Sequence, residues 1–223
     1  MNYQNLEYHF GWQAAQEYAR GLRFAVSHDR PVIPDYGVNE RGSGDMYYRG
    51  SNYLHTLRAV VVNDSLWREM FLGLNREFYH QTVGTEALVG YMSKVLGMDV
   101  APIATQYLMD TRLPILEYGF RDGQLRYRYA QVRSDFAMPV DVKVEILSDS
   151  AGKSDVVSEI RLMSTTRWQS LDLSKVMDLG KAGLATVDGS DVSDFLDQFQ
   201  WKLQVDADFY VGTLEVNPGE RGV

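Results

Sequence analysis

The residues of this chain best placed to do chemistry lie at positions 43–58, where a tyrosine stands at the start of a predicted helix. Ser43, Gly44 and Asp45 break regular structure and offer helix N-caps. Apolar and small residues then recur at helical spacing, at Gly50, Leu54, Leu57 and Val61. We therefore expect a helix with Tyr47 in its first turn, where the positive end of the helix dipole favours negative charge. A phenol hydroxyl in that place is suited to hydrogen-bond an oxyanion.

The residue order around Tyr47 favours a catalytic role over aromatic packing, which is the more common role of a tyrosine on an arbitrary helix. Residues 47–50 have the sequence Tyr-Tyr-Arg-Gly, and residues 54–58 have the sequence Leu-His-Thr-Leu-Arg. Together they resemble the Tyr-x-Lys/Arg-Gly segment of the zinc aminopeptidases related to aminopeptidase N and leukotriene hydrolase (peptidase family M-one). In that family the first tyrosine of the segment donates a hydrogen bond to the tetrahedral intermediate, so the resemblance implies this catalytic role for Tyr47.

Three neighbours of Tyr47 are candidates for substrate binding. Gly44, Asp45 and Met46 would line the cleft beside the tyrosine if the resemblance holds. Loop shape and helix capping account for the same three residues equally well. Both interpretations stay open at the level of the sequence.

The resemblance implies zinc in the parent enzyme, but this chain carries no zinc-binding motif. A zinc aminopeptidase needs H-E-x-x-H and a further Glu ligand, whereas the four histidines here, at positions 9, 28, 55 and 80, are scattered. We interpret each as a packing or surface residue and expect no metal site and no cofactor in this chain. The zinc motifs of the family precede the segment that the chain resembles. The resemblance thus implies the C-terminal part of a catalytic domain, inactive as a peptidase when alone.

Other kinds of site find less support. The sequence has no G-x-S-x-G nucleophile elbow and no third glycine of a dinucleotide site after Gly42 and Gly44. Asp206 and Asp208 fall in a predicted turn, where solvation or capping is the usual role. A second hypothesis, from a different class, is a non-catalytic peptide-binding or interaction module derived from the same family.

Hydrophobic periodicity predicts that helices position Tyr47 and fill the N-terminal half. An apolar residue every fourth position, beginning at Leu6 and Phe10, predicts one helix that runs to about Phe24. A loop with two prolines follows over residues 27–37. Beyond the Tyr47 helix, caps and periodicity predict helices after residues 63–65, over 85–97 and over 101–109.

At Pro114 the hydrophobic period changes from 3.6 to two. Strands are predicted over residues 116–120 and 125–129, joined by the hairpin turn Asp122-Gly123. Further alternating segments cover residues 140–146, 156–162, 201–205 and 209–216. Such a series of short strands indicates a β-sandwich, and a β-sandwich follows the catalytic domain in the aminopeptidase family. Residues 173–200 are rich in glycine and aspartate, with a short helix predicted at 192–199 and no functional interpretation.

The predicted fold class is therefore α+β with two domains. Residues 1–112 are expected to be all-α, and by resemblance they would be the C-terminal helical part of a thermolysin-like catalytic domain. Residues 113–223 are expected to form an all-β sandwich.

Composition limits the partners. The 223 residues carry 30 acidic and 22 basic side chains, a formal charge of −8, and no cysteine. Attraction to nucleic acid or to an anionic membrane surface is thus not expected, and no apolar run reaches the ~18 residues of a membrane span. By resemblance, the partners would be a peptide substrate and the missing N-terminal catalytic subdomain. Without that subdomain, the helices at Leu6 and Tyr47 should expose apolar surface and favour self-association.

Overall fold

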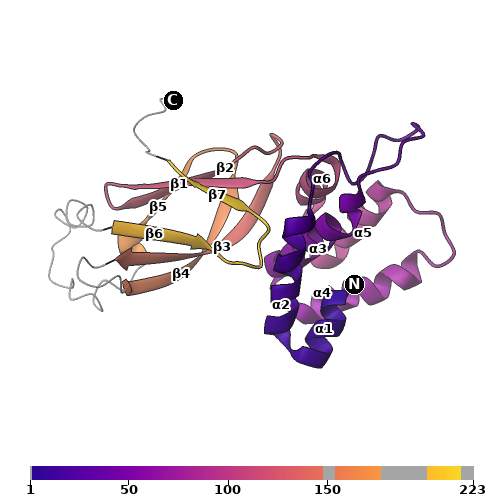
Figure 1. Ribbon diagram of the computed structural model, residues 1–223, viewed down its shortest axis with the longest axis horizontal. Helices are drawn as coiled ribbons and strands as arrows, with labels where there is room; N and C mark the ends of the chain where they lie inside the picture. Colours follow the sequence, from indigo (N-terminus) through magenta and orange to yellow (C-terminus); the bar gives the residue numbers. More distant parts are fainter. Residues whose placement is uncertain (1, 148–153, 177–199, 217–223) are drawn as a thin grey trace. The chain divides into compact units, whose positions relative to one another are not determined.

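The computed structural model describes residues 2–147, 154–176 and 200–216, which form two compact units (Figure 1). Unit 1 comprises Met1–Leu113 together with Ala207–Tyr210, and unit 2 comprises Pro114–Asp206 and Val211–Val223. Unit 1 is helical in its described residues and unit 2 is made of strands, so the described chain has the predicted α+β composition in two parts. The helix predicted at residues 192–199 lies outside the described residues.

Six α-helices and two short 3-10 helices make up the described part of unit 1. They are α1 (Asn2–Phe10), α2 (Trp12–Gly21), η1 (Leu22–Ala25), η2 (Gly44–Met46), α3 (Tyr48–Val61), α4 (Asp64–Glu77), α5 (Thr85–Leu96) and α6 (Ala101–Met109). The predicted end signals are present: the Asn63 side chain accepts a hydrogen bond from the Leu66 N–H at the start of α4, and Gly97 ends α5 with a φ of 66°. Within the described residues, no helix has the length and apolar content needed to cross a membrane.

The prediction of one continuous helix to Phe24 is wrong, because Gly11 separates α1 from α2. Gly11 has a φ of 85° and a ψ of 168°, a conformation that is essentially restricted to glycine and incompatible with a helix. The break also changes the buried face. Ala15 and Ala19 are fully buried, whereas Phe10 of the predicted stripe is 71% exposed.

Helix α3 lies at the centre of unit 1. Eight of its 14 residues are buried, and they include polar as well as apolar side chains. Tyr53, Leu57 and Val60 contribute to the apolar core together with residues of the later helices, Trp67, Met70, Met92, Leu96, Ile103 and Tyr107. A helix that is buried on most sides must satisfy its polar side chains inside the protein, and in α3 the side chains of Asn52, His55, Thr56 and Arg58 form hydrogen bonds there.

Unit 2 contains two sheets in its described residues. One has the order β5-β2-β1-β7 and the other the order β4-β3-β6. The strands are β1 (Ile115–Arg121), β2 (Gln124–Ala130), β3 (Ala137–Leu147), β4 (Ser154–Thr165), β5 (Gln169–Asp172), β6 (Gln200–Val205) and β7 (Gly212–Glu215), with the 3-10 helix η3 (Leu173–Lys175) after β5. All pairs are antiparallel except β1 with β7. The rings of Phe120 in β1 and Trp201 in β6 stack at 5.4 Å and bring the two sheets into contact.

The hairpin prediction is confirmed. Asp122 and Gly123 both have positive φ, 51° and 67°, as a two-residue turn between β1 and β2 requires. The prediction of a last strand over residues 209–216 is wrong at its start, since β7 begins at Gly212. Phe209 and Tyr210 are buried in unit 1 instead. Strand β5 was not predicted, because four residues are too few for a clear alternation.

Candidate functional site

Tyr47 lies at the junction between η2 and α3. It is the N-cap residue of α3, one position before the predicted first turn, and it has helical torsions of −80° and −52°. The Ser51 N–H donates to the Tyr47 carbonyl at 3.2 Å, so the backbone of Tyr47 is continuous with the helix. Its side chain is 68% exposed. The phenol is therefore accessible to a ligand and stands at the positive end of the α3 dipole.

The three candidate substrate-binding residues form η2, directly before Tyr47. Gly44 and Met46 are exposed, and Met46 retains 43% of its accessible surface. Asp45 is 2% exposed, and its two carboxylate oxygens accept hydrogen bonds from the backbone N–H groups of Ser27 at 2.9 Å and His28 at 2.8 Å. Asp45 thus points into the protein and anchors the turn, while Met46 and Tyr47 face solvent.

Ser43 caps η2 and ties it to the preceding loop. Its hydroxyl accepts a hydrogen bond from the Asp45 N–H at 3.0 Å and donates one to the Asp29 carboxylate at 2.5 Å. The hydrogen bonds from Ser43 and Arg30 hold the pKa of Asp29 below its ordinary value. Loop residues 27–29 and the turn before Tyr47 are therefore joined by three side-chain hydrogen bonds, two to Asp45 and one from Ser43 to Asp29.

Arg49 holds the first turn of α3 from the inside. The side chain is fully buried, and Nη2 donates to the carbonyl oxygens of Gln106 at 3.3 Å and Arg112 at 3.4 Å. Burial lowers the pKa of Arg49, and the nearby Tyr210 and Asp45 oppose this effect. Nε and Nη1 have no hydrogen-bond partner among the described residues. Arg49 thus fixes α3 to the end of α6 at the cost of an incompletely paired buried cation.

His28 connects the Asp45 anchor to the C-terminal part of unit 1. Its Nδ1 lies 2.8 Å from the carbonyl oxygen of Thr111, and its Nε2 lies 2.9 Å from the hydroxyl of Tyr210. A carbonyl oxygen can only accept, so Nδ1 carries a hydrogen. In the neutral ring Nε2 is then the acceptor, and Tyr210 donates to it.

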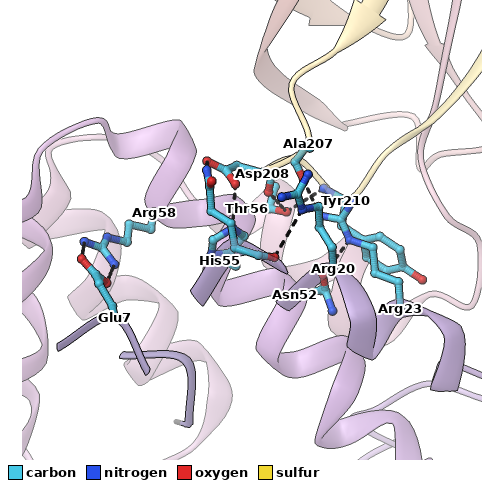
Figure 2. Close-up of polar contacts among 11 residues, drawn as sticks. Glu7, Arg20, Arg23, Asn52, His55, Thr56, Arg58, Ala207, Asp208 and Tyr210 are labelled. Atoms are coloured by element: carbon cyan, nitrogen blue, oxygen red, sulfur yellow. Dashed lines mark hydrogen bonds and ion pairs between the residues drawn. The ribbon is translucent and has the colours of Figure 1, made fainter. Parts of the chain in front are cut away.

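The segment Ala207–Tyr210 is inserted among the helices of unit 1 (Figure 2). Asp208 accepts hydrogen bonds from Gln16 at 2.6 Å and from Nε2 of His55 at 3.0 Å. The Arg23 guanidinium donates to the Ala207 carbonyl at 2.8 Å. The segment is thus held by side chains of α2, η1 and α3. Asp208 lies in a turn, as predicted, but its carboxylate is bound by Gln16 and His55 and not left to solvent.

Tyr210 is fixed at both ends of its backbone. Its N–H donates to the Thr56 hydroxyl at 2.8 Å, and its carbonyl oxygen accepts from the Tyr107 hydroxyl at 2.6 Å. Burial raises the pKa of Tyr107, so that this phenol stays protonated and remains a donor. The Arg23 guanidinium lies 5.1 Å from the centre of the Tyr210 ring.

A second polar cluster joins α1, α3 and α4. Arg58 makes two hydrogen bonds to Glu7, at 2.6 and 3.0 Å (Figure 2). It makes one to Asp64 at 2.8 Å. Its guanidinium also lies 4.6 Å from the centre of the Trp12 ring. These contacts raise the pKa of Arg58 although burial acts in the opposite direction. The cluster stabilises the helices around Tyr47 and makes no contact with Tyr47 itself.

The described residues offer no ligand set for zinc. Across residues 2–147, 154–176 and 200–216, no group of three or more His, Asp or Glu side chains could hold a metal ion. His9 and His80 are exposed, and His28 and His55 are engaged in the contacts given above. The zinc that the family resemblance implies therefore does not fit the described part of this chain.

Two hollows of unit 1 have linings that do not include Tyr47. One of about 420 Å³ is lined by residues of α4, α5 and their connection, including Phe78, Tyr79 and Leu88. Another of about 350 Å³ is lined by Arg68, Arg76 and other residues of the same two helices. Tyr47 is in neither lining, so the candidate site is an exposed turn and not one of these hollows.

Comparison with known proteins gives a distant structural likeness. No family model matches the chain, and no curated protein matches it. Among solved structures, it is similar to a chain in the crystal structure of Legionella pneumophila aminopeptidase A in complex with aspartic acid, with 12% identity and a TM-score of 0.46. The match covers 72% of this chain and 20% of that chain. At this level the likeness carries no argument about fold or activity, so the function proposed below rests on the residues of this chain.

Proposed function

We propose that this chain is part of a zinc-dependent aminopeptidase in which Tyr47 hydrogen-bonds the tetrahedral intermediate. Unit 1 would be the C-terminal helical part of the catalytic domain, and unit 2 would be the β-sandwich that follows it. The observation that carries the proposal is an exposed phenol at the N-cap of a 14-residue helix, on a turn held by a buried carboxylate.

The placement of Tyr47 suits oxyanion stabilisation. Attack of water on a peptide carbonyl turns the carbonyl oxygen into an oxyanion, and a donor already in place stabilises this charge without reorganisation. The dipole of α3 favours negative charge at the same point. Because Asp45 and Ser43 fix the turn, the phenol would need little reorientation before it donates.

The metal and the residue that activates water would be supplied by another part of the complete enzyme, since the described residues of this chain contain no ligand cluster. When bound there, zinc would polarise the substrate carbonyl and activate water. This chain would contribute the tyrosine donor, its support and a surface for the peptide near Gly44 and Met46.

Unit 1 also exposes apolar side chains that fit the proposed need for an N-terminal catalytic subdomain. Tyr8, Phe10 and Phe24 are 85%, 71% and 96% exposed. Large exposed apolar side chains are suited to be covered by a partner. In the complete enzyme the partner would be the missing subdomain, and for this chain alone we expect concentration-dependent self-association.

Metal analysis and peptide turnover of the natural gene product that contains this chain test the proposal. We expect one zinc per polypeptide and stepwise release of N-terminal amino acids from unblocked peptides, with no release from N-acetylated peptides as the matched control. Peptide binding without zinc and without release would contradict the enzyme and favour the alternative, a non-catalytic peptide-binding module derived from the family.

A further inference from the structure

Tyr210 is remote from Tyr47 in the sequence but belongs to the same contact chain in unit 1. The Tyr210 hydroxyl donates to Nε2 of His28 at 2.9 Å, and the His28 backbone N–H donates to the Asp45 carboxylate at 2.8 Å. Asp45 precedes Tyr47 by two residues and anchors η2. Two consecutive hydrogen bonds therefore lead from the C-terminal segment to the turn that carries Tyr47.

Tyr210 and His28 are each held by further contacts, so a displacement of the Tyr210 side chain would be passed on to His28 and Asp45. Tyr210 is 6% exposed, and Thr56 and Tyr107 bind its backbone. The ring of His28 is bound on its other side by the Thr111 carbonyl. Since both ring nitrogens of His28 are engaged, the ring cannot rotate without losing a hydrogen bond.

His28 also has a backbone conformation that needs support. Its φ of 52° lies in the left-handed region, which an ordinary side chain adopts only when surrounding contacts maintain it. That conformation directs the His28 N–H at the Asp45 carboxylate, next to the Ser27 N–H. The two ring hydrogen bonds of His28, the stacking of its ring on Tyr210 and its N–H bond to Asp45 hold it there.

We propose that Tyr210 is a positioning residue for Tyr47, which acts by holding His28 and, through it, the Asp45 anchor. The turn before Tyr47 is then completed by a segment that lies between β6 and β7 in the sequence. The catalytic meaning of this coupling rests on the proposed function of Tyr47, whereas the coupling itself can be measured on the 223-residue chain.

Tyr210→Phe tests the coupling, because it removes the hydroxyl and keeps the ring. The matched control is Tyr53→Phe, which removes a buried hydroxyl of α3 that has no hydrogen-bond partner among the described residues. The readout is amide NMR of Ser27, His28 and Tyr47. We expect Tyr210→Phe to shift the Ser27 and His28 amide signals and to speed their hydrogen exchange about fivefold, the effect of one ordinary hydrogen bond. Tyr53→Phe should leave both unchanged.

The contact between Tyr210 and His28 can also be tested by changing His28. His28→Asn keeps a residue that tolerates the left-handed conformation and removes the imidazole. It should produce the same change in exchange at Ser27, and the double variant with Tyr210→Phe should show no further increase, since the two residues lie on one path. This variant also carries the test if Tyr210→Phe does not fold.

The proposal is overturned if Ser27 and His28 exchange in Tyr210→Phe at the wild-type rate, or if the two substitutions add in the double variant. In the zinc-bearing natural gene product, Tyr210→Phe should lower kcat and leave KM unchanged. If Tyr47→Phe leaves turnover intact while Tyr210→Phe still speeds exchange at Ser27, the proposed function fails and the coupling stands. If Tyr47→Phe lowers turnover while Tyr210→Phe leaves exchange at Ser27 at the wild-type rate, the coupling is refuted and the proposed function stands.

Discussion

Asp45→Asn is expected to weaken the helical unit more than any exposed change in the same region. Asp45 is 2% exposed and accepts two backbone hydrogen bonds, at 2.9 and 2.8 Å. An asparagine of the same shape offers one oxygen to these two N–H groups and turns an NH₂ donor toward the other. One charge-assisted bond is lost and the other is weakened.

The magnitude follows from the surroundings of the two donors. A hydrogen bond to a charged group contributes about 1.5–3 kcal/mol, but Ser27 is exposed and His28 is half-buried, so that water can partly replace the lost acceptor. We therefore expect the free energy of unfolding to fall by about 2 kcal/mol, within the range for one such bond. Asp45→Ala should cost about 1 kcal/mol more, because it also leaves a small void.

Urea unfolding at pH 7, followed by circular dichroism at a helix-sensitive wavelength, measures this loss in the unit that contains the substitution. Asp35→Asn is the matched control: it makes the same chemical change on an exposed residue of the preceding loop, and should stay within about 0.5 kcal/mol of the wild type. The reasoning is refuted if Asp45→Asn is no less stable than Asp35→Asn.

Three further predictions concern the support of unit 1, each measured as a free energy of unfolding. Burial disfavours the charged form of Asp208, but its two side-chain donors outweigh burial and hold its pKa below 3.8, so its stabilisation is complete above that pH and lost as the pH falls below it. Asp208→Asn should therefore cost about 1 kcal/mol at neutral pH, and the difference from the wild type should shrink as the pH falls below the ordinary pKa of an aspartate. Gly11→Ala should cost about 2 kcal/mol because of its φ of 85°, whereas Gly90→Ala, on an exposed face of α5, should stabilise by about 0.5–1 kcal/mol. Arg58→Met should cost about 2 kcal/mol, since it removes the ion pairs to Glu7 and Asp64 from a largely buried guanidinium; a loss near zero would show that the cluster is only a surface contact.

The helices and the first hairpin could be predicted because their signals are local. Asn63 caps α4 with its own side chain, and Asp122 with Gly123 forms the turn that the dipeptide favours. Tyr47 could be placed at a helix start for the same reason. The sequence also places Gly11 inside the predicted apolar stripe, but the spacing of the apolar residues alone does not indicate that the helix breaks there.

The support of Tyr47 could not be predicted, because it joins residues that are distant in the sequence. No periodicity or motif links Asp208 to His55, or Tyr210 to His28. Phe209 and Tyr210 fit the alternation of a strand, yet they are buried among helices. Apolar and amphipathic residues carry the same pattern whichever unit they are buried in, so only the structure shows where this segment lies.

The most direct test of the account is the turnover of Tyr47→Phe in the natural gene product that contains this chain, proposed above to bear zinc, beside Tyr48→Phe as the neighbouring control. Both tyrosines are exposed, but only Tyr47 is the N-cap of α3. We predict that Tyr47→Phe lowers kcat on the order of 10²-fold with zinc content and KM unchanged, the effect of removing one oxyanion donor, and that Tyr48→Phe keeps nearly wild-type turnover. Near-normal turnover of Tyr47→Phe with intact zinc would contradict the account.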